Sequence, residues 1–466
     1  MTKNKTIIIT CGGTGGHIFP AIEIAKFFKK QDSLDVLFVG ALGRMEMDKV
    51  PKTGFKIIGI WIQGYYRKSI FRNLLFPLKL IISLIQSFFI LRKHKPLAVI
   101  GTGGFASFPI LYVASFLGIK TYIQEQNCYP GLANRILGKR VNRVFVAHTG
   151  LEKFFPKNKI LNFGNPVRKS LKIDTVSKKE SREFFGLKED VFTILVIGGS
   201  LGAEAINKAI HSILCSSSEL SFWINQEFKN GKNSEDYNKY MSFRERKLED
   251  QVPEYIKLIK KLQMFGNNCQ FIWQTGDKGG SSHSLRLYKE KFEFLVKDKP
   301  EDVFIEYISG IYHQNYCSVH KFIDRMDLAY QAADIVISRA GAIAISEICF
   351  LSKPSILIPS PHVTADHQTI NAEYLVTNDA CIVFPENHLN KEALVDDNSQ
   401  DLSRFTYPSK SSLDPVGKFP IKLITAINDL KNKDKREQMG KNANKLFKYN
   451  TADEITSVIL SDIKLV

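Results

Sequence analysis

A glycine-rich hexapeptide that ends in histidine, GGTGGH at residues 12–17, is the first stretch of this chain that could do chemistry. It follows the apolar run TIIIT (6–10) and precedes a helix-like pattern at 18–30. Glycines let backbone N–H groups approach a ligand closely, and a helix N-terminus adds partial positive charge. The loop therefore predicts a site for an anionic or oxygen-rich ligand. His17 would stand at the edge of this site, as a base or as a structural histidine.

Two further glycine loops also follow apolar runs, GTGGF at 101–105 and GGSLGA at 198–203. Loops at the carboxyl ends of parallel strands converge on one crevice, so these loops predict a shared substrate site. GGTGGH has neither the spacing nor the acidic partner of a dinucleotide fingerprint, and it is not a Walker loop. GGSLGA also fits G-x-S-x-G, which leaves a serine hydrolase with Ser200 as nucleophile as an alternative.

A carboxylate follows a fourth strand-like run, in SRAGAIAISEI at 338–348. The pattern is a strand end, a turn of small residues and a helix start, with Glu347 in the first turns of the helix. This carboxylate could accept two hydrogen bonds from a ribose diol. The alternative is a favourable interaction with the helix dipole alone.

Apolar runs and helical patterns alternate along the chain, which predicts an α/β fold with parallel sheets. In the first half, strands are expected at 6–10, 35–39, 56–60, 97–101, 120–123, 143–146 and 159–162, and helices at 18–30, 72–92, 108–117 and 131–138. The pattern restarts at TILVIGGS (193–200). We therefore predict two doubly wound domains, 1–170 and 191–435, joined by a polar linker at 171–190. A C-terminal helix within 436–466, near 436–448, would cross back to the first domain.

Two polar, weakly periodic segments interrupt the second half, at 216–262 and 277–320. We interpret them as surface insertions around a core strand at 270–276. The seven cysteines are scattered and form no C-x-x-C pair, which indicates buried thiols in a reducing compartment and no zinc site.

The positive charge of this chain is concentrated in its first third. The formal net charge is +17 overall, but residues 1–175 contribute +19 and the remainder −2. The apolar stretch LLFPLKLIISLIQSFFIL (74–91) lies within this basic part. A crossover helix packed on the sheet is one interpretation of it. Contact with the interface of an anionic membrane, across the basic and apolar stretch 67–95, is the other.

The order of these motifs resembles the MurG family of bacterial N-acetylglucosaminyltransferases, which act on lipid I. The matching segments are GGTGGHIFPA (12–21), GRMEMDKVP (43–51), GTGGFASFP (101–109), QEQNCYPGLANR (124–135), GNPVR (164–168), GGSLGA (198–203), FIDRMDLAYQAADIVISRAGAIAISEI (322–348) and ADHQTINA (365–372). The resemblance implies a GT-B fold, with two Rossmann-like domains facing each other across a cleft. It implies inverting transfer of N-acetylglucosamine from its UDP donor to the 4-hydroxyl of the muramyl-pentapeptide of lipid I, forming lipid II on the cytoplasmic face of the membrane.

The resemblance also implies a set of donor-binding residues. Ser200 would bind the diphosphate, the Ile323 backbone the uracil and Glu347 the ribose. The full set is Thr14, Gly15, Gly16, Asn127, Arg168, Ser200, Ile323, Ala342, Ile343, Ala344, Ile345, Ser346, Glu347 and Gln368. A histidine of near-neutral pKa is an economical base for the 4-hydroxyl, so His17 is the catalytic candidate, with acceptor positioning as its alternative role. We expect no protein-bound metal and no tightly bound cofactor, and a divalent cation only as an aid to UDP release.

The expected partners are UDP-N-acetylglucosamine, undecaprenyl-linked lipid I and an anionic membrane surface. Nucleic acid is not expected, because the chain has no helix-turn-helix signature and no aromatic RNA-binding motif. The alternatives are another GT-B enzyme (a glycolipid synthase or a UDP-sugar epimerase), the Ser200 hydrolase, and a sugar-nucleotide binder without chemistry.

Overall fold

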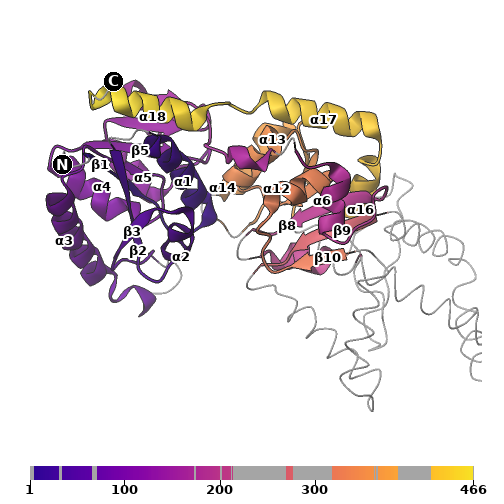
Figure 1. Cartoon of the computed structure of the whole chain (residues 1–466), viewed down its shortest axis with the longest axis horizontal. Coiled ribbons are helices and arrows are strands. Elements are labelled where there is room, and N and C mark those ends of the chain that lie inside the picture. Colours follow the sequence, from indigo (N-terminus) through magenta and orange to yellow (C-terminus); the bar gives the residue numbers. More distant parts are fainter. Residues whose placement is uncertain are drawn as a thin grey trace, which may run out of the picture.

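Two parallel sheets, each covered by helices, form the two lobes of the molecule (Figure 1). The computed structural model describes residues 5–30, 34–65, 71–172, 175–199, 202–210, 213, 269–276, 317–361, 363, 366–386 and 421–464. The predicted insertion at 216–262 and most of the one at 277–320 lie outside these residues. The last four residues of the second insertion instead form a strand, β10 (Cys317–His320), which pairs in parallel with β9 (Cys269–Gln274).

The first sheet has seven strands in the order β3-β2-β1-β4-β5-β6-β7. Its strands are β1 (Lys5–Thr10), β2 (Leu34–Ala41), β3 (Lys56–Ile60), β4 (Ala98–Gly101), β5 (Lys120–Glu125), β6 (Arg143–Val146) and β7 (Ile160–Asn162). Successive side chains point to opposite faces of a strand, so Ile7 and Ile9 of β1 enter one core layer and Ile8 enters the other. These strands agree with the predicted ranges to within two residues at each end.

Helices cover both faces of the first sheet. They are α1 (Gly15–Lys29), α2 (Met45–Lys49), α3 (Phe76–His94), α4 (Ser107–Phe116) and α5 (Leu132–Leu137), with 3-10 turns η1 (Pro51–Thr53), η2 (Phe71–Asn73), η3 (Lys157–Lys159) and η4 (Lys169–Leu171). Helix α1 packs on the Ile7 face, and α3 and α4 pack on the Ile8 face. Helix α1 begins three residues before the predicted start, so His17 lies in its first turn and not in the loop.

The second sheet has six strands in the order β10-β9-β8-β11-β12-β13. Besides β9 and β10, its strands are β8 (Phe192–Ile197), β11 (Ile335–Ser338), β12 (Ser355–Leu357) and β13 (Ile382–Val383). Its helices are α6 (Lys178–Phe184), α12 (Met326–Ala332), α13 (Ala342–Phe350), α14 (His367–Val376), α16 (Ile421–Asp429) and α17 (Lys433–Lys445). Both sheets thus repeat one strand–loop–helix arrangement, and the predicted α/β architecture of two Rossmann-like domains is confirmed.

The segment 171–190, predicted as a linker, contains a helix and residues of the second core. Ser177 and Glu180 form a reciprocal capping box that begins helix α6, and the helix packs against α12. Leu171, Phe185 and Leu187 are buried in the core of the second lobe. This polar segment therefore belongs mostly to the second domain, because its few apolar residues point inward.

The chain ends in two helices where one was predicted. Helix α17 packs against α13 of the second lobe. The chain then crosses to the first lobe, where α18 (Thr451–Asp462) lies against α1 (Figure 1). Ile455, Ile459 and Leu460 of α18 join the core layer that contains Ile7 and Ile9. The crossing helix is therefore α18, downstream of the predicted 436–448, and Thr451 fixes its start by donating to the carbonyl oxygen of Phe163 at 2.6 Å.

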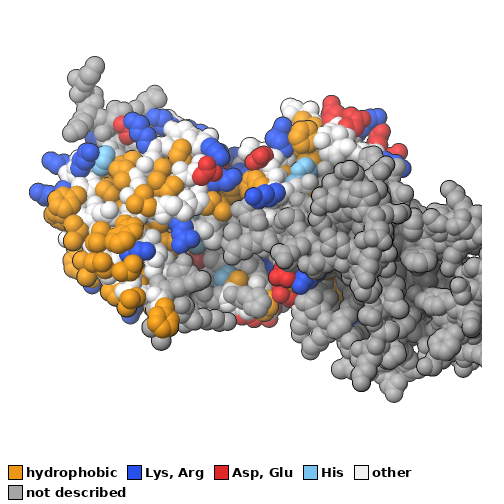
Figure 2. All heavy atoms as spheres, turned by 90° about the horizontal axis from the view of Figure 1, so that it is seen from below, with side chains coloured by type: hydrophobic (Ala, Val, Ile, Leu, Met, Phe, Trp, Pro, Cys, Tyr) orange, Lys and Arg blue, Asp and Glu red, His pale blue; other side chains and the backbone are white. Residues whose placement is uncertain are grey.

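Helix α3 packs against α4 and leaves one apolar face uncovered. Ile81, Ile85 and Phe89 are each more than half exposed along this face. Seen from below, the first lobe carries gathered hydrophobic side chains with lysines and arginines around them (Figure 2). Among the described helices, none combines the length and the hydropathy that crossing a membrane requires.

Candidate active site between the two sheets

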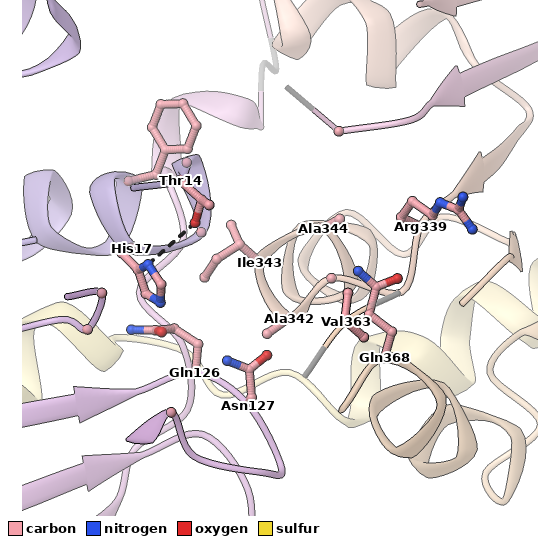
Figure 3. A pocket seen from close by; sticks show the side chains of 18 of the residues that line it. Thr14, His17, Gln126, Asn127, Arg339, Ala342, Ile343, Ala344, Val363 and Gln368 are labelled. Atoms are coloured by element: carbon pink, nitrogen blue, oxygen red, sulfur yellow. Dashed lines mark hydrogen bonds between the residues drawn. The ribbon is translucent and has the colours of Figure 1, made fainter. Parts of the chain in front are cut away.

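A cleft of about 1760 Å³ lies between the two lobes, where glycine loops and helix starts from both sheets meet. Figure 3 shows Thr14, His17, Gln126 and Asn127 on one side of it and Ala342, Ala344, Arg339 and Gln368 on the other. The predicted residues that line the cleft are Thr14, Gly15, Gly16, His17, Asn127, Arg168, Ile323, Ala342, Ile343, Ala344, Glu347 and Gln368. Residues that are far apart in sequence are thus brought to one site.

Of the other three predicted residues, two are described and do not line the cleft. Ser200 lies outside the described residues. Ile345 is buried in the core of the second lobe, and Ser346 accepts a hydrogen bond from Asn165 Nδ2 at 3.0 Å. Both belong to α13, where 3.6 residues make one turn, so consecutive residues cannot all face one ligand. Of the predicted donor-binding residues 342–347, Ile345 and Ser346 therefore point away from the cleft.

His17 faces the cleft with one ring nitrogen engaged. Its Nδ1 lies 3.0 Å from the carbonyl oxygen of Gly12 and 3.4 Å from the hydroxyl of Thr14. A carbonyl oxygen only accepts, so Nδ1 carries the proton and Nε2 keeps a lone pair in the neutral ring. Burial lowers the pKa of His17, and the carboxylate of Glu125 opposes this shift only in part. The ring is therefore a neutral base at physiological pH.

The glycine loop just before His17 is held by a buried carboxylate, Glu46 of α2. Its two oxygens accept from the backbone N–H groups of Gly13 and Ala41, each at 3.0 Å. The second glycine loop packs directly on the first. A Cβ on Gly104, whose φ is +84°, would collide with the carbonyl oxygen of Gly12. Gly104 is therefore required both by its positive φ and by the close approach of the two loops.

A second buried carboxylate, Glu125 at the end of β5, organises the loop that follows it. Its Oε1 accepts from the backbone and the side-chain amide of Asn127. Its Oε2 accepts from the backbone of Gly131 at 3.2 Å and from Asn134 Nδ2 at 2.9 Å. Four donors on one carboxylate hold the side chain of Asn127 in a single orientation at the wall of the cleft.

The two lobes are joined next to the site by buried amides. Asn371 of α14 accepts from the backbone of Cys128 at 3.2 Å and donates to Asn127 Oδ1 at 3.4 Å. Asn165 accepts from Gln124 Nε2 in the first lobe and donates to Ser346 in the second. The position of Asn127 therefore depends on how the lobes are docked.

Two of the predicted donor-binding residues contact each other. Arg168 Nη2 donates to Glu347 Oε1 at 2.8 Å, and the hydroxyl of Tyr330 donates to Glu347 Oε2 at 3.2 Å. Burial raises the pKa of Tyr330 well above its ordinary value, so the phenol keeps its proton. The guanidinium of Arg168 also stacks on Phe19 of α1, 4.5 Å from the ring centre. In this structure both carboxylate oxygens of Glu347 thus already hold a partner.

Two other predicted contacts are also engaged. The backbone N–H of Ile323 donates to Gln274 Oε1 at 3.0 Å. Gln368 lines the cleft, and its Oε1 accepts from the backbone N–H of Ser360 at 2.9 Å. A ligand that used the N–H of Ile323 would have to share it with Gln274.

The sequence analysis missed the residues that hold these groups in place, namely Glu46, Glu125, Tyr330, Asn165 and Asn371. Glu125 had a signal, since a lone acid ends the apolar run TYIQE directly before the loop. The two asparagines lie within the segments GNPVR and ADHQTINA, but nothing near either one marks its partner in the opposite lobe. Within the described part of the chain, no three His, Cys, Asp or Glu side chains gather into a potential metal site.

The chain is similar to known glycosyltransferases along most of its length. The model of the glycosyltransferase family 28 N-terminal domain matches residues 7–146, and that of the family 28 C-terminal domain matches residues 232–405. A relative from Flavobacterium psychrophilum, named UDP-N-acetylglucosamine–N-acetylmuramyl-(pentapeptide) pyrophosphoryl-undecaprenol N-acetylglucosamine transferase, is 41% identical over 386 residues, which are 83% of this chain and 86% of the relative. A relative of the same name from Amoebophilus asiaticus is 34% identical over 97% of this chain and 98% of its own length.

A solved structure shares the fold. The crystal structure of MurG from Acinetobacter baumannii matches with a TM-score of 0.59 and 21% identity. The match covers 98% of this chain and 99% of that chain. The GT-B arrangement of two Rossmann-like domains is therefore established for the lobes described above.

Proposed function

This chain belongs to the MurG family within glycosyltransferase family 28, and from that premise we propose that it makes lipid II. It transfers N-acetylglucosamine from UDP-N-acetylglucosamine to the 4-hydroxyl of the muramyl-pentapeptide of lipid I, with inversion at the anomeric carbon. Lipid II is a precursor of peptidoglycan, so the activity would support cell-wall growth, cell shape and division. The observation that carries the proposal is that the family's glycine loops, EQN segment and GNPVR segment line one cleft.

In the proposed mechanism, His17 takes the proton from the acceptor hydroxyl. Nε2 accepts this proton, because Nδ1 is already committed to Gly12. The acceptor oxygen then bonds to the anomeric carbon as the bond to the UDP oxygen breaks. A neutral, partly buried imidazole suits this role, since it needs no prior deprotonation at physiological pH.

The leaving UDP must be stabilised as it gains negative charge. We propose that the first turn of α13 and Ser200 supply hydrogen-bond donors to the diphosphate, with Glu347 on the ribose, the Ile323 backbone on the uracil and Gln368 on the sugar hydroxyls. Backbone N–H groups at a helix start can stabilise such charge without a metal ion. A divalent cation would then act only in the release of UDP.

We further propose that the enzyme docks on the cytoplasmic face of the membrane as a peripheral protein. The exposed apolar face of α3 supports this, because Arg92 and Lys93 end the same helix and residues 51–100 contain nine basic and no acidic residues. Apolar contact and attraction to anionic headgroups add up in such a surface. Flotation with vesicles tests it: binding should need anionic lipid and should weaken in Ile85→Glu.

The alternative functions are less well supported. A UDP-sugar epimerase or a glycolipid synthase would share the fold. The relatives named above, however, match most of this chain and are named as lipid I transferases. The hydrolase with Ser200 would leave the first lobe's loops without a role.

The experiment that tests the proposal is transfer of label from UDP-N-acetylglucosamine to a soluble lipid I analogue. Label on the lipid is the expected result. Binding of UDP-N-acetylglucosamine without transfer would contradict the assigned acceptor and favour a different enzyme of the same fold.

A further inference from the structure

We propose that one arm of the cleft binds the first isoprene units of the acceptor's polyprenyl chain, apart from any contact of α3 with the bilayer. The inference rests on the proposed function. The cavity that contains His17 continues along the first lobe as far as Phe76 and Leu80 of α3. The site for the reacting sugar and this apolar end are parts of the same cavity.

The arm is lined by apolar side chains from two helices, α3 and α5, and one loop. Tyr65 and Phe76 pack edge to face, with ring centres 5.6 Å apart. Leu132 and Ile136 lie four residues apart on α5, so they share one face of the helix, and they are 55% and 45% exposed. Both line the same cavity as the glycine loops. We name this set, Tyr65, Phe76, Leu80, Leu132 and Ile136, the prenyl arm.

Binding of a sugar nucleotide does not explain the apolar side chains of the prenyl arm. Its diphosphate, ribose and hydroxyls need hydrogen-bond donors and acceptors, which the rest of the cleft supplies. Exposed leucine and isoleucine side chains in a cleft gain free energy only when an apolar ligand covers them. Each methylene group that leaves water favours binding by roughly a factor of four. Of the substrate's parts, the hydrocarbon chain next to the acceptor diphosphate is the one that fits this chemistry.

The prenyl arm is distinct from the exposed face of α3. Phe76 and Leu80 lie one helical turn apart and face the cavity, whereas Ile81, Ile85 and Phe89 form a separate stripe that does not line it. The lipid would thus leave the bilayer beside α3 and pass between α3 and α5 toward His17. Because one cavity joins this apolar wall to the site of the reacting sugar, a hydrocarbon chain attached to the acceptor is the occupant we favour.

The test uses soluble acceptor analogues without vesicles. Muramyl-pentapeptide diphosphates with a methyl or a citronellyl group are compared below their aggregation concentrations. We expect kcat/KM to be about tenfold or more higher for the citronellyl acceptor, given the gain per methylene group. Ile136→Gln and Leu132→Gln should lower this ratio severalfold, Ile136→Leu should restore it, and Phe184→Gln, an equally exposed apolar position on α6, should not change it.

A direct binding measurement separates this inference from the proposed function. Geranyl diphosphate should bind the wild type more tightly than inorganic diphosphate, and Ile136→Gln should remove the difference. If that difference is present but no acceptor is glycosylated, the prenyl arm stands and the proposed function fails. Equal use of methyl and citronellyl acceptors by an active wild type would overturn the inference. So would an equal fall of the ratio in Ile85→Gln, which would assign the chain to the outer face of α3.

Discussion

The two walls of the cleft use buried carboxylates in different ways. In the first lobe, Glu46 and Glu125 accept from backbone and amide N–H groups of their own lobe. In the second lobe, Glu347 accepts from Tyr330 of the same lobe and from Arg168, which stacks on the first. The first pair has only local, permanent partners. Glu347 has one partner that a ligand could replace.

This difference between the carboxylates indicates which part of the site is already ordered before the donor binds. A loop held by charge-assisted hydrogen bonds to its own backbone is organised without a ligand. A carboxylate that is shared between an arginine and a phenol can accept ribose hydroxyls in place of the arginine, provided that the released guanidinium is paired again by the anionic diphosphate. We infer that the first lobe is a fixed cradle for the base, and that the second lobe adjusts to the nucleotide.

The largest expected effect is the loss of the base from the fixed wall. His17→Ala should lower kcat by about 10²–10⁴, the usual contribution of a general base, while binding of UDP-N-acetylglucosamine is retained. Single-turnover rates and equilibrium binding measure the two quantities. His320→Ala, a histidine that does not line the cleft, is the matched control.

The pH profile sharpens the same prediction. The base must be neutral, so activity falls as the pH falls through the pKa of His17. Burial lowers this pKa below its ordinary value of 6.5, so the acid limb of kcat/KM should lie below pH 6.5. Full activity in His17→Ala would remove the base assignment.

Loosening the fixed wall should have the next largest effect. Glu125→Gln replaces one of two accepting oxygens with a donor that faces other donors, which should cost about 2 kcal/mol of stability. Because Asn127 loses its fixed orientation, kcat/KM for the donor should fall as well. Urea unfolding and steady-state kinetics measure the effects, with the exposed Glu152→Gln as control. Unchanged stability would show that Glu125 does not hold this loop.

The adjustable wall should give a smaller effect, limited to the nucleotide. Glu347→Gln should weaken UDP binding by about tenfold, as expected for a charged hydrogen bond. The preference for UDP over 2′-deoxy-UDP should shrink in the variant, because the ribose diol loses its acceptor. Calorimetry with both nucleotides measures it, and an unchanged preference would remove Glu347 from the ribose.

Tyr330→Phe should reproduce a fraction of that loss. The lost hydrogen bond is made to the Glu347 carboxylate and not to the nucleotide, so we expect an effect of only about 1 kcal/mol, or roughly fivefold weaker UDP binding. The effect should vanish in the Glu347→Gln background if the hydroxyl acts only through the carboxylate. Additive losses in the double variant would mean that Tyr330 contacts the nucleotide independently.

The smallest effect is expected on removal of divalent cations. With EDTA, the single-turnover rate should stay unchanged, because the chemical step uses protein groups. Steady-state turnover should slow, because release of the charged product loses its aid. Loss of the single-turnover burst itself would place a cation in the chemical step.

Local patterns predicted the fold well. The seven strands of the first sheet followed from apolar runs bounded by turn residues, because a parallel strand buried on both faces is apolar throughout. Some errors lie at boundaries, and others lie in the polar segments, where α6 and β10 were not predicted. Helix α1 includes Gly15 and Gly16, residues of low helix propensity, since the following apolar stripe and the sheet fix the helix there.

The site was predicted in its parts and not in its connections. Glycine loops and a histidine mark a ligand edge locally. The bond between Asn371 and Asn127 joins residues 244 positions apart, and nothing near either one signals the other. The pairing of Arg168 with Glu347 was hidden for the same reason, although both were assigned to the donor. The sequence predicted residues that line the cleft better than it predicted the residues that orient them.

The return of α18 to the first lobe has a consequence for biosynthesis. The ribosome completes all strands of the first sheet early, yet one of its core layers still lacks Ile455, Ile459 and Leu460. During synthesis of the second lobe, the matching apolar groove beside α1 stays uncovered and open to chaperones or to non-native contacts. The N-terminal lobe therefore acquires its final packing only after the last residues leave the exit tunnel, so its maturation is post-translational.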